Sequence, residues 1–349
     1  MKPDTYPMLK TSLQLCSLFF ALLFNSLLIF LVKTKSPKKM GTYKYLMIYF
    51  ALFAIFFTCL ENVVQPYAHT HGCSFLVIMR LAPNSLINPK IAFFLICFLT
   101  GCFGFTIALI SIHFVFRLFA LERRGKLRYF DRKYLPFWFS IPVFVGANHT
   151  LLSVLVFAPN EHFSDYVRKS VFENYGLLID DQVYMGAYFY PPDASGTPKL
   201  DWTVALGFVD LFLTASVSFS ILIYCGSRSY CKIKNLMKEG RSRYTRNLQK
   251  QLYKALVVQA CIPTVLMFVP VGIFISAPLL YLNVEFLSKL TTITYAVYPA
   301  IEPIPIIFIV DDYRKATVSM LKLDWCKRNK VSNTNEEVST TENSGNAQI

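Results

Sequence analysis

Long apolar runs separated by short polar segments set the pattern of this chain. Seven runs span residues 12–32, 45–64, 91–115, 137–157, 202–225, 255–282 and 290–310. Each is long enough to cross a bilayer as a helix, which needs about 20 apolar residues. The first run is too long for the apolar part of a signal peptide and has no small-x-small site before Lys33, so we expect it to be retained. The pattern predicts an all-α membrane protein, a bundle of seven transmembrane helices.

Charge alternates between successive loops. Residues 33–44 hold five lysines and no acid, residues 117–133 hold seven basic residues against two acids, and residues 227–254 hold nine against one. The intervening residues 62–90 carry few charges, and 159–201 are acidic overall. Because lysine and arginine concentrate in cytoplasmic loops, this phase predicts an extracellular amino terminus and a cytoplasmic carboxyl terminus.

The apolar runs and the predicted orientation divide the chain into three parts. We expect an extracellular amino terminus over residues 1–11, a seven-helix domain over 12–325 and a disordered cytoplasmic tail over 326–349. The tail is rich in Asn, Ser, Thr and Glu and has little to bury. Residues 311–315 halt the last run, and the stretch up to Leu323 is expected to form a short amphipathic helix on the membrane face.

Composition supports a membrane protein and excludes several other classes. Hydrophobic residues make up 54% of the 349 and charged residues only 16%, whereas a soluble domain carries roughly 25% charged residues. The net charge of +14 lies mostly in short loops, which indicates anionic lipid and acidic cytoplasmic partners rather than nucleic acid. The sequence contains no zinc, phosphate-loop or nucleophile-elbow motif. We therefore expect no enzyme, no cofactor and no bound metal.

Three ionisable residues within the apolar runs are the candidates for ligand binding: Glu61, Asp210 and His149. Each costs about 3 kcal/mol to place in a membrane, so such residues usually face a polar cavity. Glu61 has an alternative, since a long side chain near a helix end can reach the interface cheaply. Asp210 is deeper and shorter, which favours a cavity that opens to the outside.

Prolines interrupt the last two runs. Pro263 and Pro270 lie in the sixth, and Pro299 and Pro303 in the seventh. Each removes a backbone donor and kinks its helix. Kinked helices can act as hinges for switching, although proline is also common at static kinks in membrane helices. Their clustering in two runs favours hinges.

Four blocks of sequence in a fixed order carry a family resemblance, which covers about Leu28 to Thr317. The blocks are Gly-Thr-Tyr-Lys-Tyr-Leu-Met at 41–47, His-Phe-Val-Phe-Arg at 113–117, the segment 248–257 that leads to Pro263, and Tyr-Pro-Ala-Ile-Glu-Pro at 298–303 followed by Asp-Tyr-Arg at 312–314. Together they resemble the nematode Str-class seven-helix chemoreceptors, a group that contains odorant receptors of sensory neurons.

This resemblance implies a G-protein-coupled-receptor-like bundle in the plasma membrane of a sensory cilium. Its partners would be a small odorant or water-soluble ligand, a heterotrimeric G protein and membrane lipids. The candidates for G-protein coupling are Arg117, Arg123, Arg124, Lys250 and Lys254. Basic residues of this kind can also simply hold the bundle against anionic lipid.

Two departures from rhodopsin-like receptors follow from the same comparison. Arg117 stands where those receptors carry the Arg of Asp-Arg-Tyr, but Phe116 precedes it, so an acidic partner is missing. The acidic outer loop, residues 159–201, contains no cysteine. The common disulfide between the third helix and that loop is therefore impossible here.

Two alternatives to a receptor remain open from the sequence. A small-solute transporter can share this topology, but transporters commonly show internal repeats and matched broken helices. No repeat relates the first three runs to the last three, and the prolines cluster in only two runs. A ligand-gated channel of the insect odorant-receptor kind has its amino terminus inside, and the basic loops argue the reverse.

Overall fold

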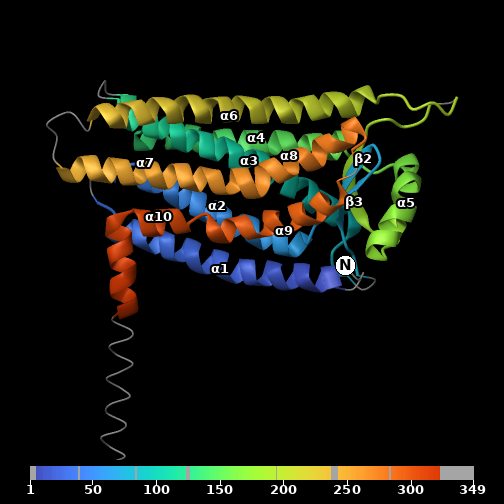
Figure 1. Cartoon of the computed structure of the whole chain (residues 1–349), viewed down its shortest axis with the longest axis horizontal. Coiled ribbons are helices and arrows are strands. Elements are labelled where there is room, and N and C mark those ends of the chain that lie inside the picture. Colours follow the sequence, from blue (N-terminus) through green and yellow to red (C-terminus); the bar gives the residue numbers. More distant parts are fainter. Residues whose placement is uncertain are drawn as a thin grey trace, which may run out of the picture.

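The structure, a computed structural model, describes residues 5–37, 40–82, 85–122, 126–193, 195–236, 243–282 and 284–322. Within these residues, seven helices are long and apolar enough to cross a membrane. They run side by side along one axis, as Figure 1 shows. The predicted seven-helix membrane bundle is thereby confirmed. The expected tail, residues 326–349, lies outside the described residues.

Five of the spans are unbroken helices: α1 (Thr5–Lys35), α2 (Tyr43–Val64), α3 (Pro89–Leu121), α4 (Leu135–Val156) and α6 (Trp202–Leu236). Several begin earlier or end later than their apolar runs, because helical geometry continues into polar residues at the membrane surface. The start of α3 has a local cause: the side chain of Asn88 accepts a hydrogen bond from the backbone N–H of Lys90 at 2.9 Å. The short helices η2 (Lys126–Phe130) and η3 (Arg132–Tyr134) connect α3 to α4.

The last two spans are interrupted at their prolines, as predicted. The sixth consists of α7 (Arg243–Pro263), the π-helical turn η5 (Thr264–Phe268), α8 (Val269–Ser276) and η6 (Ala277–Leu280). The seventh consists of α9 (Glu285–Ile301) and α10 (Ile304–Ile309). Residues 311–322 then form a further helix, which turns away from the bundle direction in Figure 1. We refer to that end of the bundle as the tail end.

A three-stranded antiparallel sheet closes the opposite end, and the all-α expectation did not anticipate it. Its strands are β1 (Tyr67–His71), β2 (Ser74–Met79) and β3 (Val183–Tyr188), in the order β1-β2-β3. β1 and β2 form a hairpin in the loop after α2, whereas β3 comes from the loop before α6. The ladder runs from Ser74 opposite Tyr188 to Met79 opposite Val183. Backbone hydrogen bonds thus join two loops that are distant in sequence.

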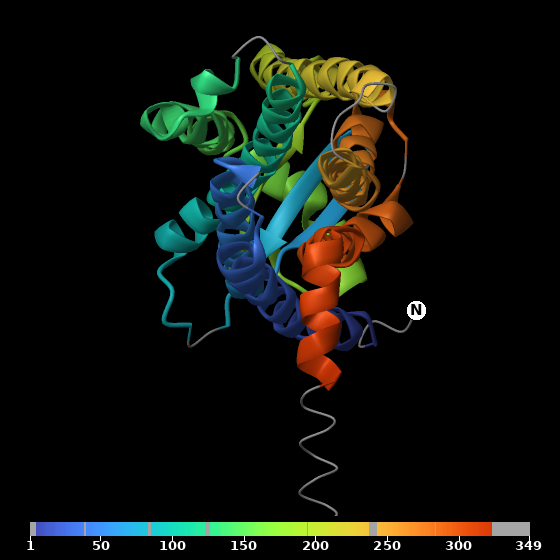
Figure 2. The same ribbon diagram turned by 90° about the vertical axis from the view of Figure 1, so that its left-hand side faces the viewer.

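Helix α5 (Glu161–Tyr175) and the short η4 (Ile179–Asp181) complete this cap. Their apolar side chains, among them Phe163 and Val167, pack with Leu76, Ile78 and Tyr184 from one face of the sheet. The other face of the sheet packs on the interior of the bundle. We call β1, β2, β3 and α5 together the lid. Viewed from the tail end, the strands cross behind the ring of helices (Figure 2).

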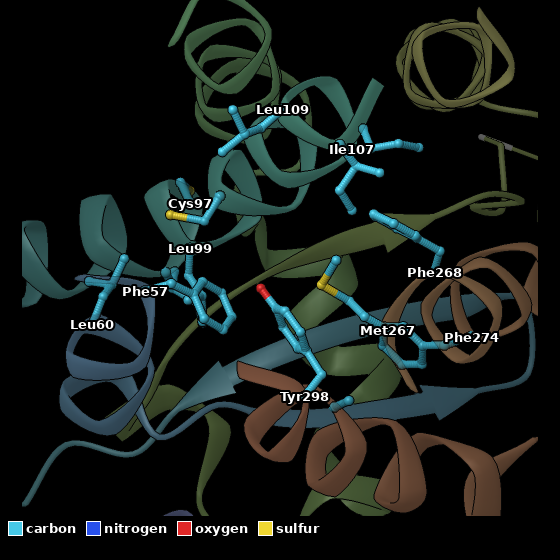
Figure 3. Close-up of a cluster of buried hydrophobic side chains, with 14 of the residues drawn as sticks. Phe57, Leu60, Cys97, Leu99, Ile107, Leu109, Met267, Phe268, Phe274 and Tyr298 are labelled. Atoms are coloured by element: carbon cyan, nitrogen blue, oxygen red, sulfur yellow. The ribbon is translucent and has the colours of Figure 1, made fainter. Parts of the chain in front are cut away.

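The main core lies between α2, α3, α9 and η5, directly beneath the lid. Figure 3 shows Tyr298 from α9 and Met267 from η5 directed toward α3. A second core nearer the tail end joins α1, α2, α7 and α10 around Tyr43 and Tyr313. A hollow remains between the main core and the lid.

Candidate ligand-binding cavity and signalling end

The hollow beneath the lid is a cavity of about 360 Å³. α3, α6, α8, α9 and the inner face of the sheet supply its walls. Aromatic side chains dominate the lining: Phe75, Phe103, Phe157, Phe212, Phe219, Phe268, Phe274 and Tyr295. None of the described residues that line it is Asp, Glu, Lys or Arg. The volume is at the lower end of the range of about 300–1,000 Å³ typical of small-molecule sites.

Most polar groups in the lining already have partners inside the protein. The hydroxyl of Tyr295 donates to the carbonyl of Leu99 at 3.2 Å. The hydroxyls of Thr100, Thr291 and Thr292 each donate to the carbonyl four residues earlier in their own helix. These bonds hide the hydroxyl donors and leave a surface that is apolar in effect.

His149 is the one sequence-predicted ligand residue that lines the cavity. Its side chain is fully buried. Neither ring nitrogen has a hydrogen-bond partner among the described residues. The ring rests on Gly104 of α3, where an added Cβ would lie 2.6 Å from Nδ1. A side chain at position 104 would therefore displace the imidazole, and the glycine is what lets the ring reach this place.

Asp210 lies beside the cavity rather than in its wall. Its carboxylate accepts a hydrogen bond of 2.8 Å from the side-chain amide of Asn148. This contact joins α6 to α4 one residue away from His149. A role for Asp210 in ligand sensitivity stays a prediction, and the geometry makes that role one of positioning α4.

Glu61 faces α1 and does not line the cavity. The carboxylate is 1% exposed and accepts a hydrogen bond of 2.5 Å from Gln14 Nε2. Lys10 lies on the same side of α1, donating to the carbonyl of Gln65 at 2.7 Å and sitting 3.3 Å over the ring of Tyr67. Glu61 therefore does not extend to the interface. It belongs to a polar contact that ties α1 and α2 to β1.

At the tail end, Arg117 is buried rather than presented on the surface. Its side chain is 2% exposed, and the guanidinium donates to the backbone carbonyl of Gln249 in α7. No acidic side chain among the described residues forms an ion pair with it, in agreement with the missing acid at position 116. Among the described residues, Arg117 thus holds α3 against α7 through a neutral acceptor, the carbonyl of Gln249.

The other coupling candidates divide into two groups. Lys250 and Lys254 are exposed on α7, one turn apart. Arg123 and Arg124 lie outside the described residues. Further contacts tie α7 to its neighbours at this end: Tyr253 donates to the carbonyl of Gly226 at 3.1 Å, and Gln251 bonds Asp311 through both its amide oxygen and nitrogen. Any movement of α7 away from α6 and from Asp311 would therefore break these hydrogen bonds.

Glu302 was not among the candidates, although a carboxylate within an apolar run is the same signal that pointed to Glu61. It lies between α9 and α10, fully buried, and accepts a hydrogen bond from Gln259 of α7. Its other oxygen has no partner among the described residues. Pro299 and Pro303 flank Glu302. The seventh span is therefore broken at the same place where Glu302 is hydrogen-bonded to Gln259 of the sixth span.

The proline positions match departures from regular helix. Pro263 precedes the π-helical turn, Pro270 stands in the first turn of α8, and Pro299 and Pro303 bracket the break between α9 and α10. Such breaks leave backbone groups that can exchange partners. Their use as hinges stays a prediction.

The lid contains a histidine that should make it sensitive to acid. His69 in β1 pairs with the hydroxyl of Ser170 in α5 at 2.9 Å, and burial lowers the pKa of its imidazole to about 4. Because the pKa of His69 is lower in the folded lid than in the unfolded chain, its neutral ring stabilises the lid fully above pH 6.5. This contribution to lid stability is lost as the pH falls toward 4. We expect the lid to lose about 2 kcal/mol of stability between pH 7 and pH 5.

Hydrogen exchange of β1 and β2, corrected for the intrinsic pH dependence, measures this change. The His69→Gln variant keeps a neutral side chain that can bond Ser170, so its lid should show no such loss. An equal acid response in both proteins would assign the effect to groups other than His69.

Seven helices that are long and apolar enough to cross a membrane, arranged around an internal cavity, define a multi-pass membrane protein. The model of the family described as serpentine type 7TM GPCR chemoreceptor Str matches residues 10–318. The chain therefore belongs to the Str family of serpentine chemoreceptors. It is 31% identical to the serpentine receptor class r-10 of Caenorhabditis elegans over 300 residues, which cover 85% of this chain and 86% of that receptor.

Two further relatives are similar in sequence to this chain along nearly its whole length. The serpentine receptor class r-10 of Caenorhabditis briggsae is 30% identical over 323 residues, covering 91% of this chain and 90% of the relative. The G-protein coupled receptor str-217 of Caenorhabditis elegans is 31% identical over 329 residues, covering 93% and 94%. The resemblance expected from the four sequence blocks is confirmed.

Proposed function

We propose that this protein is a chemosensory receptor that binds a small molecule in the cavity beneath the lid and activates a heterotrimeric G protein at the tail end. The observation that carries the proposal is the cavity itself, which lies inside a bundle of the Str family and is lined by both the lid and the proline-broken spans. A ligand there contacts α8 and α9 directly, so it can favour one arrangement of these spans over another.

The proposed orientation puts the lid outside the cell and the tail end in the cytoplasm. The basic loops support it, because residues 33–44, 117–133 and 227–254 all join helices at the tail end. Sensory cilia of the plasma membrane are the proposed location, which rests on the family alone.

The proposed coupling step is the release of Arg117 from Gln249. A buried guanidinium bound to one neutral carbonyl gives up less on release than one held by a carboxylate. Movement of α7 away from α3 would free it for acceptor groups of the G protein, while Lys250 and Lys254 add positive charge beside the opening.

A reporter-cell screen tests the proposed function. Cells that express the full chain are exposed to volatile and water-soluble compounds, and calcium and cAMP are recorded, with cells that lack the chain as the control. A response in the parent chain that the control lacks supports a receptor. Uptake of an active compound without any second-messenger change would instead favour the transporter alternative.

The contact between Asp210 and Asn148 leads to a milder prediction. We expect Asp210→Ala to weaken ligand sensitivity by roughly three- to tenfold, because the loss of one hydrogen bond between α6 and α4 loosens the wall that carries His149. The dose response in reporter cells measures it. Asn148→Ala removes the same bond from the other side and should give a similar shift, and an unchanged dose response in both variants would leave the pair with no role in sensitivity.

A further inference from the structure

We infer that the ligand of this cavity is an uncharged, mostly apolar molecule with one polar group, and that His149 is the residue that binds this polar group. The inference rests on the proposed function, since it names the chemical class that the proposed site accepts. Three features of the described residues carry it: the charge-free lining, the partners of the lining hydroxyls, and the unpaired imidazole.

The lining excludes a charged ligand. An ion moved from water into an apolar site loses its hydration and needs an opposite charge or several hydrogen bonds in return. The cavity offers no acidic or basic side chain. Asp210, the nearest candidate from the sequence, is turned to Asn148, and Glu61 is turned to Gln14. Neither carboxylate is part of the lining that a cationic ligand would contact.

Four of the five lining hydroxyls do not compete with His149 for a polar group. The fifth, that of Ser216, belongs to an exposed residue and gains less from a ligand than a buried group without a partner does. Those of Tyr295, Thr100, Thr291 and Thr292 already donate to backbone carbonyls. Breaking any of these bonds would expose a buried carbonyl without a partner, which cancels the gain from the ligand. The polar group of a ligand therefore finds its best partner elsewhere in the wall.

His149 is that partner. A neutral imidazole has one donor and one acceptor nitrogen, and here both are buried without a partner among the described residues. His149 lines the cavity although its side chain is fully buried. The torsion between Cβ and the ring is soft in histidine, so a turn of the ring presents one nitrogen to a carbonyl or hydroxyl group. Binding then satisfies a group that the empty protein leaves unpaired.

Gly104 provides the geometric control. The imidazole rests on it with Nδ1, Cγ and Cε1 all within 2.9 Å of where a Cβ would lie. Gly104→Ala must therefore move the ring while leaving its chemistry intact. Gly272 in α8 also lines the cavity, but an added Cβ there meets nothing within 4 Å. Gly272→Ala is the matched substitution that keeps His149 in place.

The experiment measures binding to the purified full chain in lipid nanodiscs, without a G protein. The probes are straight-chain compounds of increasing length, each as alkane, 2-ketone, carboxylate and alkylammonium, and the readout is the concentration needed for thermal stabilisation. We expect the ketones to bind best, the alkanes about tenfold more weakly, and both ions at least about a hundredfold more weakly. His149→Phe and Gly104→Ala should lower ketone binding to the alkane level, whereas Gly272→Ala should preserve the preference.

Three results would overturn the inference. One is a carboxylate or ammonium that binds as tightly as its ketone, another is an equal loss of alkane and ketone binding in His149→Phe, and the third is no binding by any uncharged probe. Because no G protein is present, the binding measurement does not depend on whether the protein couples to one. Ketone binding without signalling in cells would contradict the proposed function and not the ligand class.

Discussion

Replacing Arg117 with alanine is expected to abolish ligand-driven G-protein signalling while the receptor still reaches the cell surface. In the structure the guanidinium reaches from α3 to the carbonyl of Gln249 in α7. In the proposed coupling step this guanidinium leaves Gln249 and bonds acceptor groups of the G protein, and truncating such a charged interface contact costs about 2–5 kcal/mol, which corresponds to a fall in coupling of roughly 30-fold or more. Second-messenger output at saturating ligand, normalised to surface protein, measures it.

Gln249→Ala is the matched control for this prediction. It removes the side chain at position 249 but keeps the backbone carbonyl that Arg117 uses, so coupling should stay near that of the parent chain. Normal signalling from Arg117→Ala would remove Arg117 from the coupling mechanism. High ligand-independent signalling from the same variant would instead show that its main role is to hold the bundle closed.

The second large effect is expected at Gly186 in β3. An added Cβ there would lie 2.2 Å from the carbonyl oxygen of Phe75 and 2.8 Å from the Cα of Leu76. Both are backbone atoms of β2 and cannot turn aside as a side-chain tip could. Gly186→Ala should therefore separate β3 from β2 and destabilise the lid by about 3 kcal/mol.

Thermal unfolding of the purified protein and its level at the cell surface measure this change. The same substitution at Gly272, where a Cβ meets nothing within 4 Å, is the control and should leave both unchanged. Unaltered stability of Gly186→Ala would mean that the lid tolerates displacement of an entire strand, and it would then be a poor wall for a selective cavity.

The sequence predicted the seven spans and their breaks because membrane helices satisfy their own backbone and must be apolar along their length. The proline positions in the sixth and seventh spans could be read directly for the same reason. The lid could not be predicted. β2 and β3 are six residues each, and they come from loops separated by two spans, so their pairing depends on where the helices bring them.

The candidate site was predicted only in part because hydropathy indicates depth but not direction. Glu61 and Asp210 lie within spanning helices, yet each is turned to a polar neighbour on an adjacent helix. His149 lines the cavity because Gly104 leaves room for its ring, a contact between two helices that no single run reveals. The aromatic walls could not be separated from lipid-facing residues, since both are apolar.

The ladder between β2 and β3 carries a consequence for how the protein responds to reduction. Rhodopsin-like receptors commonly fasten the same outer loop that holds β3 to the third helix by a disulfide, whereas all eight cysteines within the described residues are free thiols. Within the described residues, the ladder therefore joins the two loops without a disulfide. A strong reductant that strips the cap from a bridged receptor should leave this one intact.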